Sequence, residues 1–316
     1  MLIRFTISIL ALLLFWSCEE VVDLDVDFEP QVVVVSEIAP NRPATVTVSR
    51  SRPILSQSST EFVVADQVTI TNRSNGTVVD LYLQEEIKDS LNPDSDFFPF
   101  YFSGVPEFVR DGNNYELDVV VDEENSISAI TTIPPQVSIQ SLNLLNFSAN
   151  EDPRAGQVYD INFDFSFIHA EHKSSNYHLV FYFRYIVPVA IEADTVLYYY
   201  TQIPAVNDLV MDYPYTFDFE NGVLIQGHDI PEGNHSIEGN LSVSYEDNFS
   251  RFTPELLVEL RNTSTNYHNY HFNLSRQQSQ RDSILSQAIL IPSNVSNGLG
   301  IFGGYNFDIK SVRLTN

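Results

Sequence analysis

The sequence predicts a mainly β protein with two antiparallel β-sandwich-like domains and one helix packed on the second. Three observations predict this class. The chain holds 22 Phe and 16 Tyr but only 2 Met, and aromatic residues are enriched in strands. Short segments alternate between apolar and polar residues with a period of two, and Gly, Asn, Asp or Pro separate them. Helical spacing stands out in a single segment near the C-terminus.

Charge and cysteine content narrow the classes of partner. The 316 residues include 42 Asp and Glu against 16 Lys and Arg, a formal net charge of −26. Such a surface repels phosphates, so nucleic acid and anionic lipid headgroups are excluded as partners. Hydrophobic residues make up 43% of the chain, which indicates a folded rather than a disordered protein. The single cysteine leaves no disulfide to stabilise the fold.

The first residues have the layout of a signal peptide. Arg4 supplies a positive charge, an apolar run from Phe5 to Trp16 follows, and Cys18 comes soon after it. The run is shorter than the roughly 20 residues that a membrane-spanning helix needs. A cysteine at this junction resembles a bacterial lipobox, with Phe and Trp in place of the usual Leu and small residue. We predict a lipoprotein signal peptide over residues 1–17 and lipidation of Cys18. The alternative is a plain secretory signal with an incidental cysteine.

Residues 18–30 are predicted to form an acidic tether. Glu19, Glu20 and three aspartates follow the cysteine, and such a run is typical of a solvated, flexible linker. No basic amphipathic segment accompanies it, so attachment to a membrane depends on the lipid.

Residues 31–135 are predicted to form an N-terminal β-sandwich domain. Val32–Val35 is a short buried run, and Ala44–Ser49 alternates with period two. Ser74–Gly76 predicts a hairpin turn. The spacing of the short strands is typical of an immunoglobulin-like or transthyretin-like sandwich of antiparallel strands. Residues 85–99 read as a polar insertion between two of them.

Pro134 and Pro135 mark the predicted boundary between the domains. Proline cannot donate to a β ladder and holds the chain extended, which suits a stiff hinge. Binding sites are common where domains meet. We therefore expect the ligand or partner site in the groove between the two domains, beside these prolines.

Residues 136–316 are predicted to form a C-terminal β-rich domain. Its strands are longer, and Tyr159–Phe167 alternates almost perfectly, with aromatic residues on one face. The other predicted strands are 137–147, 177–187, 195–203, 237–245, 256–260 and 307–314. The helix is expected at about residues 264–281, where Ser264 can cap it and a tyrosine-rich stripe faces the sheet. The stripe consists of Tyr267, Tyr270, His271, Leu274 and Gln278.

Gly298, Gly300 and Gly303 match the spacing G-x-G-x-x-G. A dinucleotide site needs this motif between a strand and a helix, with an acidic residue about 20 positions further on. Here a strand follows, and the sequence ends at Asn316. We expect these glycines to serve a tight passage of backbone, where φ is positive or another segment comes close.

Three groups of side chains resemble metal ligands without completing a site. The groups are His169 with His172, His268 with His271, and Asp89 with Asp94 and Asp96. The first pair lies three residues apart on a strand, where side chains point to opposite faces. The second pair shares a helix face but lacks a third ligand. The aspartates lack the glycine-centred loop and terminal Glu of a calcium loop. We predict no metal site and no cofactor.

The sequence carries no catalytic signature, and we predict a protein that is not an enzyme. It lacks G-x-S-x-G and H-E-x-x-H, and its one cysteine is assigned to lipid. Paired carboxylates are too common in so acidic a chain to indicate glycoside hydrolysis.

Several stretches together resemble a family of uncharacterised lipoproteins of the Bacteroidetes that carry a domain of unknown function. They are Cys18–Asp25, Val32–Val35, Ala44–Pro53, Ile133–Pro134, Asp218–Gly222, Tyr267–Tyr270 and Pro292–Tyr305. The resemblance covers essentially the whole chain after the signal peptide. Members of the family are typically encoded beside TonB-dependent outer-membrane receptors, so the resemblance implies such a barrel as the partner. It implies no reaction and no catalytic residue.

Two further features fit a surface protein of these bacteria. Glu19 and Glu20 resemble their signal for display of lipoproteins on the cell surface. Ser90, Thr195 and Ser283 each follow an Asp and precede an apolar residue, which is similar to the O-glycosylation motif of their exported proteins. These three residues are our candidate O-glycosylation sites.

We therefore expect a lipid-anchored outer-membrane protein, exposed on the cell surface, that acts as a binding or accessory partner of a TonB-dependent receptor. The periplasmic face of the same membrane is the alternative location. The alternative functions are a structural envelope lipoprotein that binds other proteins only and, third, a surface hydrolase of glycans or peptides. The sequence does not name a ligand.

Overall fold

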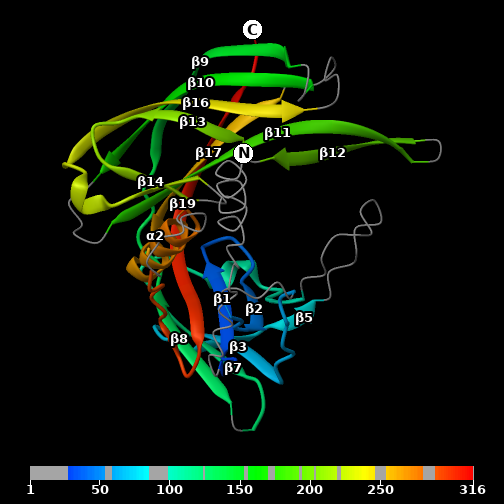
Figure 1. The fold of residues 1–316 in the computed structure, drawn as a ribbon, viewed down its shortest axis with the longest axis vertical. Helices are drawn as coiled ribbons and strands as arrows, with labels where there is room; N and C mark the ends of the chain where they lie inside the picture. The colour runs from blue at the N-terminus through cyan, green and yellow to red at the C-terminus, as the bar shows by residue number, and fades with distance from the viewer. Residues whose placement is uncertain are drawn as a thin grey trace, which may run out of the picture.

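Strands dominate the computed structural model, and one long helix accompanies them among the described residues (Figure 1). The mainly β prediction is confirmed. The structure describes residues 28–315 except 54–58, 85–98, 124, 153–155, 170–174, 192–193, 203, 219–221, 246–253 and 280–288. The predicted signal peptide, Cys18 and most of the tether therefore lie outside the described residues. No helix in the described ranges is long and apolar enough to cross a bilayer.

The strands run in chain order as follows: β1 (Val32–Ile38), β2 (Thr45–Arg50), β3 (Gln67–Asn72), β4 (Thr77–Asp80), β5 (Tyr82–Gln84), β6 (Phe100–Phe102), β7 (Asn114–Val120), β8 (Ser126–Thr132), β9 (Ile139–Asp152), β10 (Gly156–His169), β11 (Asn176–Ile191), β12 (Asp194–Gln202), β13 (Ala205–Val210), β14 (Tyr215–Asp218), β15 (Gly222–Ile225), β16 (Gly233–Tyr245), β17 (Glu255–Thr263), β18 (Val295–Ser296) and β19 (Leu299–Arg313). The helical elements are η1 (Pro106–Phe108), η2 (Gly227–Asp229) and α2 (Thr265–Ser279).

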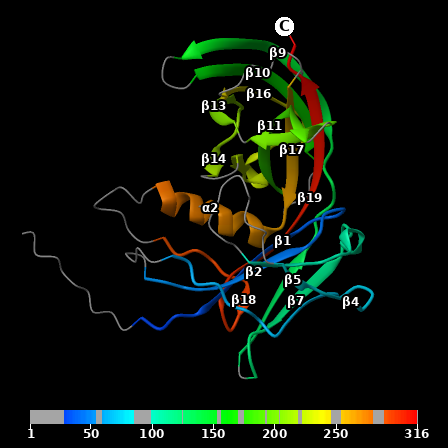
Figure 2. The same cartoon turned by 90° about the vertical axis from the view of Figure 1, so that its right-hand side faces the viewer.

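The strands form three sheets. The largest has the order β14-β15-β11-β17-β19-β1-β2-β6-β5, with β12 also paired to β11. A second sheet, β18-β8-β7-β3-β4, packs on the part that contains β1 and β2, which is the lower half in Figure 1. A third sheet, β13-β16-β10-β9, packs on the part that contains β11 and β17, which is the upper half. Figures 1 and 2 show the two sandwiches stacked along the long axis, with α2 between them.

The lower core lies between β1–β2 and the β8-β7-β3 sheet. Alternation places one side chain in two inside: Val34, Val46, Ile70 and Leu117 are at most 1% exposed. Most members of this core are aliphatic or small. Tyr115 is one of its few aromatic residues, and its buried hydroxyl is satisfied because it accepts a hydrogen bond from the Arg110 amide at 2.7 Å.

The upper core is aromatic. Phe163, Phe165 and Phe167 project inward from β10, and Phe181 and Phe183 oppose them from β11, all at most 1% exposed. The rings of Phe163 and Phe181 lie 5.5 Å apart, within the range of favourable aromatic pairs. The period-two alternation predicted for 159–167 is confirmed, because these aromatic residues share the buried face.

Strand β19 belongs to both cores. Its first half pairs with β1 in parallel, from Val33 opposite Leu299 to Ile38 opposite Gly304. Its second half pairs with β17 in the antiparallel sense. Phe302 is buried in the lower core, although it follows the predicted domain boundary by more than 160 residues.

The predicted division into 31–135 and 136–316 stays a prediction, but core membership crosses it. Val295 and Phe302 pack with the first set of strands, so residues 295–304 complete the N-terminal sandwich. Strand β19 also starts at Leu299, earlier than the expected Phe307, because pairing with β1 extends it through the glycine-rich stretch.

The expected role of the G-x-G-x-x-G glycines is confirmed. Gly300 has a φ of 111°, and a Cβ there would lie 2.0 Å from the carbonyl oxygen of Val34. A Cβ on Gly303 would lie 2.9 Å from the Tyr267 ring. The glycines let β19 approach β1 on one side and α2 on the other.

Helix α2 matches the predicted segment in position and cap. The Ser264 hydroxyl accepts a hydrogen bond from the Tyr267 amide at 3.3 Å, as an N-cap residue does. Tyr267, His268 and Ser275 are the buried positions of the helix. Of the predicted tyrosine-rich stripe, Tyr267 is therefore the residue that is fully buried. Residues 280–281 of the predicted helix lie outside the described part of the chain.

Candidate functional site: a groove above a charged junction

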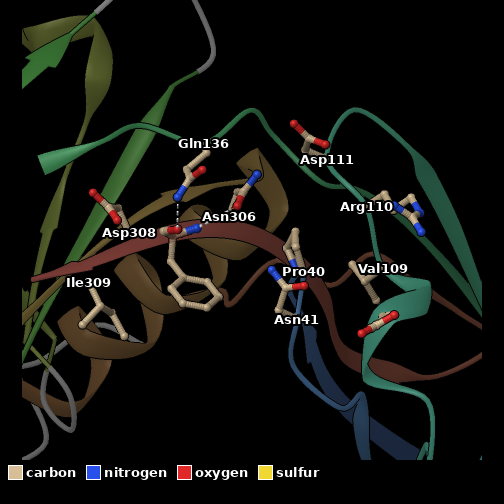
Figure 3. A pocket seen from close by; sticks show the side chains of 11 residues that line it. Pro40, Asn41, Val109, Arg110, Asp111, Gln136, Asn306, Asp308 and Ile309 are labelled. Atoms are coloured by element: carbon tan, nitrogen blue, oxygen red, sulfur yellow. Dashed lines mark hydrogen bonds between the residues drawn. The ribbon is translucent and has the colours of Figure 1, made fainter.

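A groove of about 450 Å³ lies where the lower and upper sandwiches meet (Figure 3). Its lining mixes polar and apolar side chains: Pro40, Asn41, Glu107, Val109, Arg110, Asp111, Gln136, Asn306, Phe307, Asp308 and Ile309. This is the place, next to Pro134 and Pro135, where the sequence leads us to expect a binding site. A pocket is present there, and binding in it stays a prediction.

Three segments that are far apart in sequence build the walls. Pro40 and Asn41 form the turn after β1, where Asn41 adopts a positive φ of 60°; asparagine tolerates this conformation better than most residues. Arg110 and Asp111 come from the segment after η1, and residues 306–309 of β19 form the opposite side (Figure 3).

The proline hinge is held in place by side chains. The buried Asn306 donates through Nδ2 to the Pro134 carbonyl at 3.1 Å, and Asn262 donates to the Pro135 carbonyl at 2.9 Å. Gln136 reaches across to the Phe307 carbonyl at 2.9 Å, the contact drawn in Figure 3. The hinge is thus a fixed wall of the groove, since both proline carbonyls have buried amide partners.

Arg42 connects the groove to the interior. Its guanidinium lies 3.9 Å from the centre of the Phe307 ring, within cation–π range. It also pairs with Glu259 at 2.7 Å and donates to the Tyr305 hydroxyl at 2.9 Å. Phe307, a lining residue, is therefore supported from behind by a cation that a buried carboxylate holds.

Glu259 is the centre of a buried charged cluster that we call the junction. It is fully buried, and its second oxygen accepts from Arg261 Nε at 2.6 Å. Arg261 donates to the Tyr267 hydroxyl at 3.0 Å and to the Tyr182 hydroxyl at 3.2 Å. Because a buried charge is costly without partners, these bonds satisfy both ions.

The junction continues through two histidines. The Tyr267 hydroxyl, which accepts from Arg261, is also hydrogen-bonded to His178 Nδ1, 2.8 Å away. Burial, together with the charge of Arg261, holds the pKa of His178 well below its usual value, so this ring is neutral. Its Nε2 lies 3.4 Å from Asp218 Oδ2.

His271 joins helix α2 to the end of β1. Its Nε2 lies 2.7 Å from Glu37 Oε1, and its Nδ1 lies 3.7 Å from Asp218 Oδ2. Burial disfavours charge on both groups, but their hydrogen bond and mutual attraction outweigh it. The pKa of His271 is therefore raised and the pKa of Glu37 lowered. Glu37 lies three residues before Pro40, so this ion pair also fixes the groove wall.

The groove presents a chemically mixed surface. Glu107, Arg110, Asp111 and Gln136 present exposed polar groups of both signs, and Ile309, 38% exposed, adds an apolar surface. The Asp308 carboxylate already has a partner within the protein, because its Oδ2 accepts a hydrogen bond from the Ile139 amide at 2.8 Å. Such a mixture can hold a polypeptide or another polar, partly apolar ligand.

The metal candidates of the sequence fall in different places. His271 belongs to the junction, whereas the His268 ring stacks on Phe272 and has no polar partner for either ring nitrogen among the described residues. His169 is buried against the Tyr177 hydroxyl at 2.7 Å. His172, Asp89, Asp94 and Asp96 lie outside the described residues. Within the described part of the chain, no three His, Cys, Asp or Glu side chains form a metal-binding group.

The modification candidates stay predictions. Cys18, Ser90 and Ser283 lie outside the described residues, and Thr195 lies on β12 at a point where the side chain is not described.

The sequence patterns did not predict the junction. Glu37, Arg42, Glu259 and Arg261 were not singled out, although one signal was present. Glu259 and Arg261 alternate with Val258 and Leu260 in β17, and charged residues are almost never fully buried unless they are paired.

Comparison with known proteins gives a family without an assigned activity. The model of a family described as a domain of unknown function (DUF4249) matches residues 19–311. No curated protein matches this chain. Among solved structures, the chain is similar to a mutant of the enterotoxigenic E. coli adhesin CfaE, at 8% identity and a TM-score of 0.21, covering 90% of this chain and 86% of that one. That likeness is too weak to support an argument.

Proposed function

The chain belongs to the family of proteins with the domain of unknown function DUF4249, and from this premise we propose that it is a surface-exposed, lipid-anchored outer-membrane protein. Its role in this proposal is that of an accessory partner of a TonB-dependent receptor, with the groove as the contact surface. It carries out no reaction of its own. The groove at the meeting point of the two sandwiches is the observation that carries the proposal.

Support for the anchor comes from the sequence alone. Residues 1–17 have the order of a signal peptide, and Cys18 is the single cysteine of the chain. Changing Cys18→Ala should move the protein from the membrane fraction to the soluble fraction. Retention of the variant in the membrane would show that another segment attaches it. Digestion by protease added to whole cells would separate the cell surface from the periplasmic face.

Support for the groove as the contact surface comes from its construction. The hinge, the Asn41 turn and β19 are each held by buried hydrogen bonds or ion pairs, so the walls are ordered before a partner arrives. Preorganised surfaces lose less entropy on binding. Ile309 is the exposed apolar residue of the lining, and apolar residues among polar ones are typical of the centre of an interface.

The test is recovery of partners from outer membranes. The tagged, lipidated protein is purified in a gentle detergent, and the proteins that accompany it are identified by mass spectrometry. We expect a TonB-dependent barrel. The variant Ile309→Glu should lose that barrel, because it places a charge on the groove surface. The matched control is Ile130→Glu, since Ile130 is 43% exposed and does not line the groove.

The outcomes separate the alternatives. Loss of the barrel with Ile309→Glu but not with Ile130→Glu supports the groove as the contact surface. Equal recovery with both variants would place the contact elsewhere on the molecule. Recovery of other envelope proteins, with no barrel, would favour the structural lipoprotein instead.

A further inference from the structure

The outer face of the β13-β16-β10-β9 sheet has an unusual composition. The four strands contain no Lys or Arg, and their outward positions are mainly Asn, Asp and Ser. Strands normally disfavour Asn and Asp. A set of local choices that contradicts the intrinsic preference of its element indicates a functional site. We call this surface the polar sheet face; it lies at the top of Figure 1.

Hydrogen bonds across the strands fix these short side chains. Asn240 donates to Asn162 Oδ1 at 2.6 Å and accepts from Asn207 Nδ2 at 2.6 Å. Asp160 accepts from the Ser242 hydroxyl at 2.7 Å, and Asn143 donates to Asp164 at 2.9 Å. Short side chains held in this way lose little conformational entropy when a ligand binds.

A hollow of about 190 Å³ lies in the middle of this face. It is lined by Leu145, Asn162, Phe163, Asp208, Val210, Glu238, Gly239 and Asn240. The pairing of β9 with β10 skips Leu145, and the pairing of β13 with β16 skips Asn207. Bulges of this kind redirect side chains and are over-represented near active sites. Here they accompany two exposed apolar groups beside the hollow, Leu145 at 56% and Val210 at 62%.

Polar groups with unused capacity converge on the hollow. The carboxylates of Asp208 and Glu238 have no hydrogen-bond or ion-pair partner among the described residues, and the Asn162 amide nitrogen likewise donates to none of them. Glu238 also stands directly opposite Asp164 in the β10–β16 register. Like charges in that position are destabilising, so the pair is unfavourable for the fold itself.

These features define the ligand chemistry. Carboxylates exclude anions, and no group of three metal ligands occurs in the described part of the chain. Amides and carboxylates that remain free accept from and donate to neutral hydroxyl groups, while Leu145 and Val210 can contact the C–H face of a ring. Typical pockets for drug-sized ligands hold roughly 300–1,000 Å³, so the smaller hollow suits one ring of a longer chain.

We propose that the polar sheet face binds a neutral oligosaccharide, with one sugar ring in the hollow between Leu145 and Val210. Asp208 and Glu238 accept hydrogen bonds from its hydroxyls, and Asn162 donates to one. Neighbouring sugars lie along the row of Asn and Ser side chains. This site is separate from the groove, and it stands or falls independently of the receptor partnership.

Affinity electrophoresis tests this proposal with defined probes. The protein is run in native gels that contain dextran, mannan, xylan or laminarin, and in gels with polygalacturonate as an anionic comparison. We expect retardation by at least one neutral polysaccharide and none by polygalacturonate. The double variant Asp208→Ala/Glu238→Ala should weaken that retardation at least tenfold. The matched control is Asp80→Ala/Glu123→Ala, which removes the same charge from exposed positions of the lower sandwich.

A second variant and a second probe distinguish a sugar site from a simple effect of charge. Leu145→Glu keeps both carboxylates but should abolish retardation, and circular dichroism checks that each variant is folded. Absence of retardation in all four neutral gels would overturn the proposal, and so would full retardation of the double variant. Salt-sensitive binding of poly-L-lysine that the double variant weakens and the matched control does not, without any effect of the polysaccharides, would show instead that the face binds a cationic polypeptide.

Discussion

The two apolar cores and the charged junction between them are stabilised by opposite means. The lower and upper cores bury side chains such as Ile70 and Phe163 that need no specific partner. The junction buries Glu259 and Arg261, whose cost is offset only in one geometry. Apolar burial is non-directional, so it can hold each sandwich together without fixing how the two are joined. Strand β19 joins the two sandwiches by pairing with both β1 and β17, and we infer that the junction holds the groove walls in place around that strand.

The largest loss of stability is expected for the variant Phe302→Ala. Phe302 is fully buried in the lower core, but it is supplied by β19 near the C-terminus. Loss of a buried Phe costs about 3–5 kcal/mol. We expect this loss in urea unfolding, with hydrogen exchange accelerated in β1, β7 and β8. Faster exchange confined to β10 and β11 would show that the lower core does not depend on Phe302.

Glu259→Gln tests the junction without creating a cavity. The amide keeps the shape but removes the charge that Arg42 and Arg261 share. Hydrogen bonds to charged groups contribute roughly 1.5–3 kcal/mol, and we expect a loss of that size in the unfolding free energy. Binding in the groove should weaken as well, because Arg42 supports Phe307. Unchanged stability would mean that the two arginines find other partners.

The pH dependence of the unfolding free energy should also distinguish His271, which belongs to the junction, from His268, which does not. Burial, with the charges of His271 and His228, lowers the pKa of His268 to about 4. The unfolded chain takes up this proton near pH 6.5 and the folded chain does not, so stability falls as pH falls. At pH 5 the loss from His268 is roughly 2 kcal/mol. His268→Phe should remove it, as measured by melting between about pH 7.5 and pH 5.

His271→Gln provides the comparison of opposite sign. The pKa of His271 is raised in the folded state, so its contribution is complete below its unfolded pKa and is lost as pH rises through the folded value. The cost of His271→Gln should therefore be larger at about pH 6 than at about pH 9. Equal costs at the two values would show that the Glu37–His271 contact acts without its charge.

The smallest effect is expected at an exposed ion pair. Arg50 lies 3.1 Å from Glu61, and both side chains are more than two-fifths exposed. Exposed pairs contribute about 0.2–1 kcal/mol, so Arg50→Ala should change the unfolding free energy by less than about 1 kcal/mol. A loss as large as that of Glu259→Gln would remove the distinction between junction and surface.

The sequence by itself determined the local structure. Period-two alternation gave the strands around Val46 and Phe163, the Ser264 cap gave the start of α2, and Pro134 with Pro135 indicated where the groove lies. These signals are local, because each depends on residues within a few positions of one another. The acidic composition likewise predicts that nucleic acid is not a partner, because net charge is a property of composition and not of the fold.

The tertiary structure alone decided how distant segments combine. Neither the parallel pairing of β1 with β19 nor the meeting of Glu37 with His271 across 234 residues leaves a periodic signal in the sequence. The same holds for Arg42 and Glu259. Long-range strand order and buried ion pairs depend on which folded arrangement satisfies every charge, and that is a property of the whole molecule.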